Sequence, residues 1–107
     1  DIGKRIQKVA ESEGFGVIRS LVGHGIGTKP HMSPQVPNFD VHEKGEKIVE
    51  GMALAIEPMI TAGHFDIQQL EDGWTVATSD GSLAAHFEHT VIIENGRPVI
   101  VTCWRKK

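Results

Sequence analysis

Cysteine is scarce in this chain and the charge is nearly balanced, and both features exclude classes of protein. Cys103 is the only cysteine among 107 residues, which excludes an internal disulfide framework and favours a reducing compartment. The formal net charge of −3 gives no electrostatic reason to expect nucleic acid as a partner. No apolar run approaches the roughly 20 residues that a membrane-spanning helix needs. We therefore expect a cytoplasmic protein that binds neither nucleic acid nor a membrane.

What is present is the composition of an ordinary globular domain. Hydrophobic residues make up 39% of the chain and charged residues 23%. A chain of this length can form a modest core, so we expect a single domain over residues 1–107. A helical pattern starts directly at Asp1, with no initiator methionine before it, and we expect the chain to be a segment of a longer protein.

The first residues are typical of one amphipathic helix. Ile2, Ile6 and Val9 follow the i, i+4, i+7 spacing that places them on one helical face. Asp1 precedes this pattern and suits the positive end of a helix, either as a cap or through its charge. Gly14 is a stop signal. The pattern predicts a helix that ends just before Gly14.

The next part of the chain alternates between strand-like and loop-like segments. Residues 16–22 indicate a short strand, and residues 52–57 indicate a second strand that Pro58 ends. Glycine, proline and polar residues dominate residues 23–39, which predicts an irregular loop. Residues 40–51 are polar and charged, as expected of a surface connection.

The last third of the chain predicts further antiparallel strands. Residues 73–78 indicate one strand, residues 80–81 a turn, and residues 85–93 one long strand. The pair Asn95-Gly96 is a strong hairpin signal, with a return strand over residues 98–102. One helix followed by an antiparallel sheet is an α+β layout.

Two glutamates stand among apolar neighbours in the predicted strands. A strand places Glu57 on the same face as Ala53 and Ala55, whose small side chains leave space beside the carboxylate. Glu88 lies within the long strand predicted over residues 85–93, and both glutamates look interior. An interior carboxylate is costly unless it is paired, hydrogen-bonded or bound to a metal.

These carboxylates and His24 together indicate a metal site. Two carboxylates on neighbouring strands repel each other, and a divalent cation keeps both ionised. An imidazole added to two carboxylates suits manganese, iron, cobalt or zinc better than calcium. Taken singly, Glu57 and Glu88 are equally compatible with a salt bridge or a hydrogen-bonded acid, and His24 with a hydrogen-bonded loop histidine. The three residues together favour a metal.

Other chemistry-bearing residues have plainer interpretations. His31 stands in a proline-flanked loop, where surface exposure is the simple alternative to a functional role. Trp74 fits a core position or a pocket wall, since tryptophan buries a large area. His86 and His89 flank Glu88 and are expected to pack or to orient neighbours rather than to bind a metal. Cys103 has no base near it in sequence, which makes it a poor nucleophile.

Five motifs, in this order and spacing, closely resemble those of the type I methionine aminopeptidases. They are Gly23-His-Gly-Ile-Gly27, Pro30-His-Met-Ser-Pro-Gln-Val-Pro-Asn38, Gly51-Met-x-x-x-Ile-Glu-Pro-Met59, Asp72-Gly-Trp-Thr-Val76 and Phe87-Glu-His-Thr90. The first motif alone is shared with prolidases and aminopeptidases P. Proteins of this kind have the pita-bread fold, two pseudo-symmetric α+β halves with the active site between them. The resemblance implies that this chain is the C-terminal half, with its helix packed on a curved antiparallel sheet.

The resemblance also implies roles for individual residues. His24, Glu57 and Glu88 would be metal ligands, with Glu88 bridging two ions. Glu57 would also transfer a proton, and His31 would contact the substrate and steady the tetrahedral intermediate. Trp74 would line the pocket for the methionine side chain.

The implied function is removal of the N-terminal methionine from nascent proteins by metal-activated water. The intact enzyme would hold two divalent ions, of cobalt, manganese, iron or zinc, and two of their ligands would be aspartates from the missing N-terminal half. This segment alone would bind at most one ion, weakly, and is expected to be inactive. A non-catalytic pita-bread binding module and a related Xaa-Pro peptidase are the alternatives. Met32 departs from the family, which usually has a small or acidic residue there, and is expected to alter the pocket rim.

Overall fold

The computed structural model describes residues 1–73 and 76–102, and within these residues one helix precedes ten short strands. The helix is α1 (Ile2–Ser12). The strands are β1 (Gly16–Val17), β2 (Gly23–Gly25), β3 (Met32–Val36), β4 (Ala53–Ile56), β5 (Met59–Thr61), β6 (Ile67–Gln69), β7 (Val76–Thr78), β8 (Ala84–His86), β9 (His89–Glu94) and β10 (Arg97–Ile100). The α+β layout is confirmed. None of the helical structure in the described ranges is long and apolar enough to cross a membrane.

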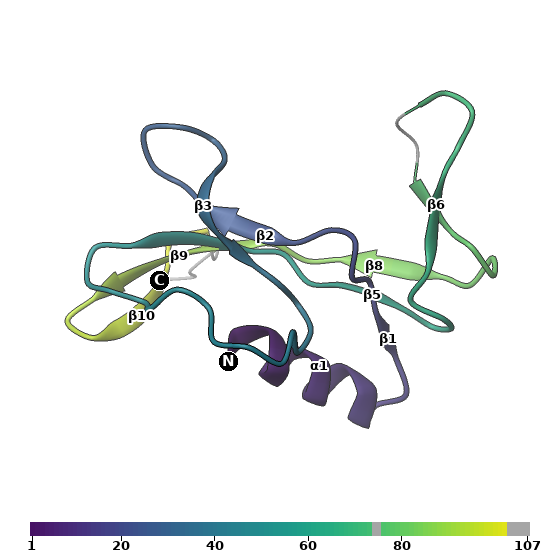
Figure 1. The fold of residues 1–107 in the computed structure, drawn as a ribbon, viewed down its shortest axis with the longest axis horizontal. Coiled ribbons are helices and arrows are strands. Elements are labelled where there is room, and N and C mark those ends of the chain that lie inside the picture. Colours follow the sequence, from purple (N-terminus) through teal and green to yellow (C-terminus); the bar gives the residue numbers. More distant parts are fainter. Residues whose placement is uncertain (74–75, 103–107) are drawn as a thin grey trace, which may run out of the picture.

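The strands form three antiparallel sheets. The largest has the order β10-β9-β4-β2-β3, a second has the order β1-β5-β8, and β6 pairs with β7 alone. The helix lies below the strands in Figure 1, on the opposite side from the β6–β7 hairpin and the β2–β3 connection. The buried apolar side chains come from α1, four strands and the residue after β1: Ala10, Val17, Ile18, Val36, Leu54, Ala55 and Val91.

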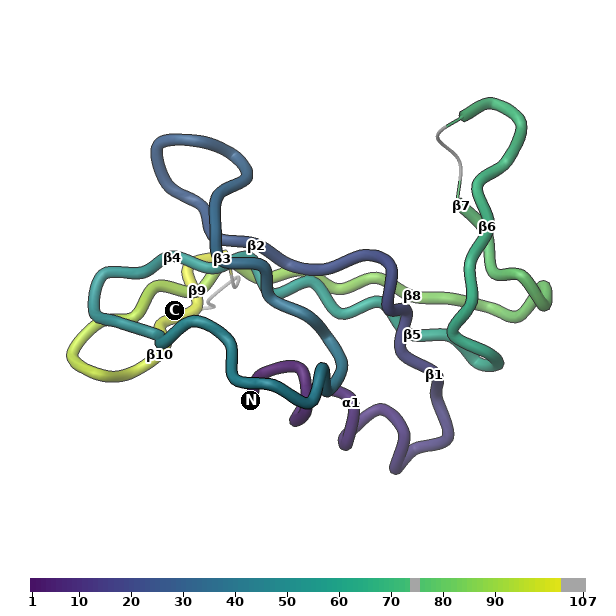
Figure 2. Tube along the Cα trace, viewed as in Figure 1, coloured from purple at the N-terminus to yellow at the C-terminus, as the bar shows by residue number. Residues whose placement is uncertain are grey.

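Two long stretches of chain run side by side from the largest sheet into the second one (Figure 2). One continues from β4 into β5 and the other from β8 into β9, with Ile56 opposite His89 and Met59 opposite His86. The single strand predicted over residues 85–93 is therefore wrong, because the ladder is interrupted. Pro58 faces this interruption and has no N–H to donate, although its carbonyl oxygen still accepts from Phe87 N at 3.1 Å.

The predicted helix is confirmed, but its buried face differs from the expected one. Gly3 and Ala10 are the buried residues of α1, whereas Val9 is 53% exposed. Helix packing here depends on close approach: a Cβ on Gly3 would lie 2.7 Å from Pro37 O. The spacing of large apolar side chains does not indicate this face, because its buried residues, Gly3 and Ala10, are small. Asp1 occupies the N-cap position without a side-chain cap hydrogen bond.

The glycine-rich segment after α1 forms strands where an irregular loop was expected. The predicted strand over residues 16–22 is reduced to β1, and β2 and β3 lie within residues 23–39. Gly23 fits between neighbours that leave no space for a side chain, because its Cβ would collide with Ala55 O. Gly25 is confined in the same way by Ser33 O. The glycines here permit tight strand packing rather than a flexible loop.

The hairpin at Asn95-Gly96 is confirmed. Their φ angles are 53° and 71°, the left-handed conformation that a two-residue hairpin loop requires. Glu50 reaches this turn, and its carboxylate accepts hydrogen bonds from Asn95 N at 2.6 Å and Gly96 N at 3.0 Å. These bonds, that from Gly96 first, lower the pKa of Glu50. The surface connection predicted over residues 40–51 is thereby tied to the last hairpin.

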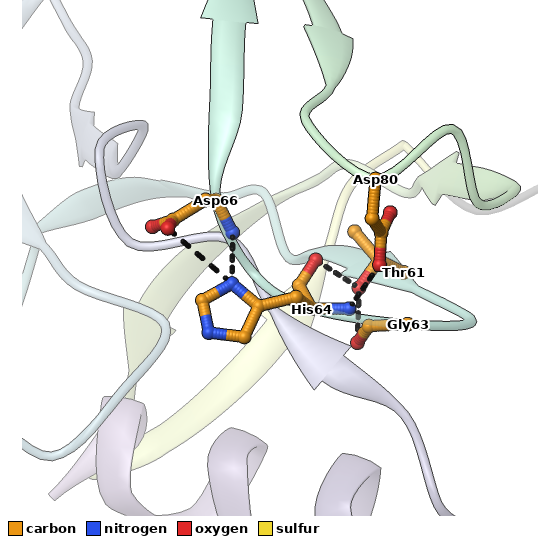
Figure 3. A network of polar contacts seen from close by, with 5 residues as sticks. All are labelled: Thr61, Gly63, His64, Asp66 and Asp80. Carbon is orange, nitrogen blue, oxygen red and sulfur yellow. Dashed lines mark hydrogen bonds and ion pairs between the residues drawn. The ribbon is translucent and has the colours of Figure 1, made fainter.

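A polar network joins the end of β5 to the segment that follows β7 (Figure 3). Asp80 accepts from His64 N at 2.8 Å and from Ser82 N at 3.0 Å. The bond from His64 and then those from Ser82 lower the pKa of Asp80 to about 2. On the other side of the network, Thr61 is buried and donates to the carbonyl oxygens of Gly63 and His64.

The lowered pKa of Asp80 predicts a pH dependence of stability. A depressed carboxyl pKa stabilises the folded state above the unfolded value near 3.8, and this contribution is lost as the pH falls toward about 2. Asp80→Asn should therefore lower the melting temperature at pH 7, and its difference from the unmodified protein should shrink between pH 4 and pH 2. Thermal unfolding followed by circular dichroism checks this, with the exposed Glu46→Gln as control. A difference that stays constant with pH would contradict the assignment.

Candidate metal centre

Three residues from separate parts of the chain converge where the largest sheet meets the second one. His24 lies on β2, Glu57 directly follows β4, and Glu88 directly precedes β9. Each offers one ligand atom, and these atoms all lie within 4.8 Å of one another. Strand register explains the convergence, since His24 pairs with Ala55, and Ala55 in turn pairs with Thr90. Glu57 lies two residues after Ala55, and Glu88 lies two residues before Thr90. Both glutamates are therefore close in sequence to the residues that the strand pairing places beside His24.

The main chain fixes how His24 presents its ring. Its Nδ1 lies 2.9 Å from Gly25 O, and a carbonyl oxygen only accepts, so Nδ1 carries the proton in this bond. In the neutral imidazole, Nε2 then offers its lone pair toward the site. A metal-ligating histidine usually donates its other ring N–H to a backbone carbonyl or a carboxylate, as Nδ1 of His24 does to Gly25 O.

The donor set fits a divalent transition metal. His24 Nε2 lies 2.9 Å from Glu57 Oε2, and the two side chains are 16% and 13% exposed. Two donor atoms bound to one ion at about 2.1 Å lie about 3.0 Å apart at a right angle and about 3.4 Å apart at the tetrahedral angle, so the observed distance is close to that of two ligands of one ion. The same distance also describes an ion pair when His24 is protonated. One imidazole with two carboxylates suits manganese, iron, cobalt or zinc.

Glu88 differs from the expectation of an interior carboxylate. Its side chain is exposed, because it lies in the interruption between β8 and β9 rather than within a continuous strand. Two of the three candidate ligands are therefore held in a half-buried pair, whereas the third reaches the cluster from solvent.

The histidines on either side of Glu88 make different contacts. His86 Nε2 lies 3.4 Å from Glu57 Oε1, the carboxylate oxygen that does not face His24. His89 Nδ1 lies 2.9 Å from Thr102 Oγ1 at the end of the β9–β10 hairpin. Of these two histidines, His86 contacts the candidate metal cluster, through Glu57, and His89 bonds to Thr102 instead.

The β2–β3 connection brings His31 next to His24. Their ring centroids are 4.2 Å apart with an interplanar angle of 45°. Met32, which begins β3, lies over Gly27, where its Sδ would be 3.2 Å from an added Cβ. Trp74 and Cys103, also considered from the sequence, lie outside the described residues.

An apolar hollow of about 200 Å³ lies beside His86. Its walls come from β5, β6, β7 and β8 and include Met59, Ile67, Val76 and Ala85. Because His86 also contacts Glu57, the hollow adjoins the metal cluster.

Sequence reasoning missed Asn38, which is completely buried and donates from Nδ2 to Glu57 O at 3.1 Å. Its segment was predicted as an irregular loop, and Asn38 ends one of the family motifs without a role assigned to it. No periodicity signals a side chain that bonds to a distant main chain. The pairing between strands would have been needed to find it.

The comparisons with known proteins agree with this fold and identify the family of the chain. The profile of metallopeptidase family M24 matches residues 1–95, and the chain belongs to this family. Methionine aminopeptidase of Clostridium perfringens is 51% identical over 102 residues, which cover 95% of this chain and 41% of that protein. The Escherichia coli K12 enzyme is 46% identical over 101 residues, covering 94% and 38%.

Solved structures give the same result. Methionine aminopeptidase of Thermotoga maritima matches with a TM-score of 0.91 and 47% identity, covering 95% of this chain and 41% of that one. The enzyme of Rickettsia prowazekii matches with a TM-score of 0.91 and 42% identity, covering 96% and 42%. The resemblance to type I methionine aminopeptidases and the expected pita-bread architecture are thereby confirmed. The chain spans about two-fifths of the length of the curated relatives it matches.

Proposed function

We propose that this chain is part of a methionine aminopeptidase that removes the N-terminal methionine from nascent proteins in the cytoplasm. The observation that carries the proposal is the convergence of His24, Glu57 and Glu88 within 4.8 Å, in a chain that is 51% identical over 102 residues to an enzyme of that name. A non-catalytic binding module would be expected to have lost one of these three side chains, and all three are present.

His24, Glu57 and Glu88 would hold the metal, with Glu88 shared between two ions of cobalt, manganese, iron or zinc. A divalent ion in such a site supplies a Lewis acid and a nucleophile derived from water. This chain alone would bind at most one ion, weakly, because Glu88 is exposed and the cluster found among the described residues has three donors. The further ligands would come from the rest of the protein.

The chain's own residues would orient the substrate and move protons. Glu57 would pass a proton between the attacking water and the leaving amine. His31, whose ring lies beside that of His24, would donate to the oxygen that becomes negative in the transition state. The apolar hollow beside His86, together with Trp74, would take the methionine side chain.

A second apolar surface would be covered by the missing N-terminal half of the same fold. An open groove of about 440 Å³ lies along α1, between the helix and the chain around Pro58 and Phe87. Ile6, Val9 and Phe15 also line it. Phe87 is 63% exposed and Val9 53% exposed. Exposed apolar area of this kind is typical of an interaction surface.

Hydrolysis of Met-Ala-Ser tests the proposed function. The full-length protein that contains this chain should release methionine when manganese or cobalt is supplied, and the isolated chain of 107 residues should show no turnover above background. Adding a chelator should abolish the activity. A peptide with proline in second position serves as control for an Xaa-Pro peptidase.

Three outcomes would contradict parts of this proposal. Preference for the Xaa-Pro peptide would favour the related peptidase. A full-length protein that binds metal but cleaves neither peptide would favour the binding module. Robust turnover by the isolated chain would show that the site is complete without the remaining ligands.

A further inference from the structure

Asn38 is a buried amide whose donor reaches the main chain of a candidate ligand. Its side chain is 0% exposed, and Nδ2 donates to Glu57 O at 3.1 Å. The carbonyl of Glu57 can only accept, which fixes the orientation of the amide. Oδ1 has no hydrogen-bond partner among the residues that the structure describes. An unpaired buried acceptor costs free energy, so the donor end is the part of this side chain with an evident role.

The register of the sheet explains why Glu57 needs a side-chain donor. β2 is the neighbour of β4 on this side, and it pairs through His24 with Ala55 and through Gly25 with Leu54. Glu57 lies beyond this ladder, and Pro58 after it has no N–H. The amide of Asn38 therefore holds the main chain where the regular strand pairing has ended.

The segment around Asn38 is itself anchored on α1. Carbonyl oxygens of Pro37 and Phe39 pack against Gly3 so closely that any Cβ there would collide with them. Asp40 N donates to Gln7 Oε1 at 2.7 Å. The helix thus fixes the position from which Asn38 reaches Glu57.

We propose that Asn38 is a positioning residue, which holds the main chain of Glu57 so that its carboxylate meets His24. Asn38 contacts the main chain of Glu57, and its action on the 2.9 Å contact between Glu57 Oε2 and His24 Nε2 is indirect. The metal part of this inference rests on the proposed function, whereas the positioning of Glu57 does not.

The test replaces Asn38 by leucine in the full-length protein. Leucine has a similar size and no donor, so the packing is retained while the hydrogen bond is lost. Supporting partners of metal ligands typically contribute 10–100-fold to affinity, and N38L should weaken Mn²⁺ binding by about that factor in calorimetric titration. The visible absorption of the Co²⁺ form should change as well, because the ligand geometry changes.

Thr61→Val is the matched control. Thr61 is also buried, at 1% exposure, and also donates to main-chain carbonyls, those of Gly63 and His64. T61V should lose stability but keep the metal affinity and the Co²⁺ spectrum of the unmodified protein. Equal losses of affinity in N38L and T61V, or an unchanged affinity in N38L, would overturn the proposal.

A metal-free readout separates this inference from the proposed function. The ¹³C signal of the Glu57 carboxylate should shift in N38L and not in T61V. If the unmodified protein binds none of Mn²⁺, Co²⁺, Fe²⁺ and Zn²⁺, the proposed function fails, and this signal still decides the role of Asn38. If N38L does not fold, Gln7→Met removes the acceptor for Asp40 N and leaves the fully buried side chains unchanged. It should shift the same signal by a smaller amount, and an unchanged signal would overturn the proposal.

Discussion

Replacing Glu88 with alanine is expected to abolish metal uptake and peptidase activity together. Glu88 contributes one of three convergent ligand atoms, and it is the member that reaches the cluster from solvent. A ligand shared by two ions affects both when it is removed. The loss of affinity should exceed the 10–100-fold that outer partners of ligands typically contribute. Metal content after dialysis and turnover of Met-Ala-Ser in the full-length protein measure the two effects.

The folding of this variant should be almost unchanged. Exposed side chains away from special contacts change stability by about 0.5 kcal/mol or less, so metal-free E88A should unfold like the metal-free parent. Glu94→Ala, at the exposed far end of β9, is the control and should keep metal and activity. Activity that survives in E88A would show that Glu88 does not bridge the ions.

Replacing Gly23 with alanine is expected to cause the largest loss of stability of any single methyl addition to β2. The new Cβ would collide with Ala55 O and lie 3.3 Å from Val36 Cβ, so the strands on both sides would have to move. Overpacking of this kind costs about 1–3 kcal/mol and more when backbone must shift, and we expect about 3 kcal/mol. Because His24 is the next residue, metal affinity should fall too. Urea unfolding of the metal-free protein measures the loss of stability.

Gly45→Ala provides the matched control for this prediction. No atom lies within 4 Å of a Cβ at Gly45, in the exposed connection before β4. Its alanine variant should be neutral or slightly more stable, since alanine reduces the freedom of the unfolded chain. A Gly23→Ala variant as stable as Gly45→Ala would show that β2 is not confined as described.

Local sequence signals predicted the elements that depend on local conformation. The helix ends before Gly14 as expected, and Asn95-Gly96 forms the predicted hairpin because both residues accept a positive φ. The ligand candidates His24, Glu57 and Glu88 were also found from the sequence, since motif residue types are preserved whatever the local structure.

Features that depend on neighbouring strands could not be predicted. Glycine usually signals a loop, and only the positions of β3 and β4 show that Gly23 allows tight packing. The interruption of the strand over residues 85–93 depends on Pro58, about 30 positions earlier. Glu88 is exposed for the same reason, and Asn38 bonds to Glu57 O where the pairing of β2 with β4 has ended. These effects arise from tertiary contacts.

The most direct measurement is an anomalous difference map from crystals of the full-length protein grown with Mn²⁺. We expect a peak within about 2.2 Å of His24 Nε2 and of a carboxylate oxygen of Glu57 and of Glu88, a normal bond length for such donors. A second peak sharing the Glu88 carboxylate would establish the dinuclear centre. Mn²⁺ bound elsewhere, with His24 and Glu57 still paired directly to each other, would show that these residues do not form a metal centre.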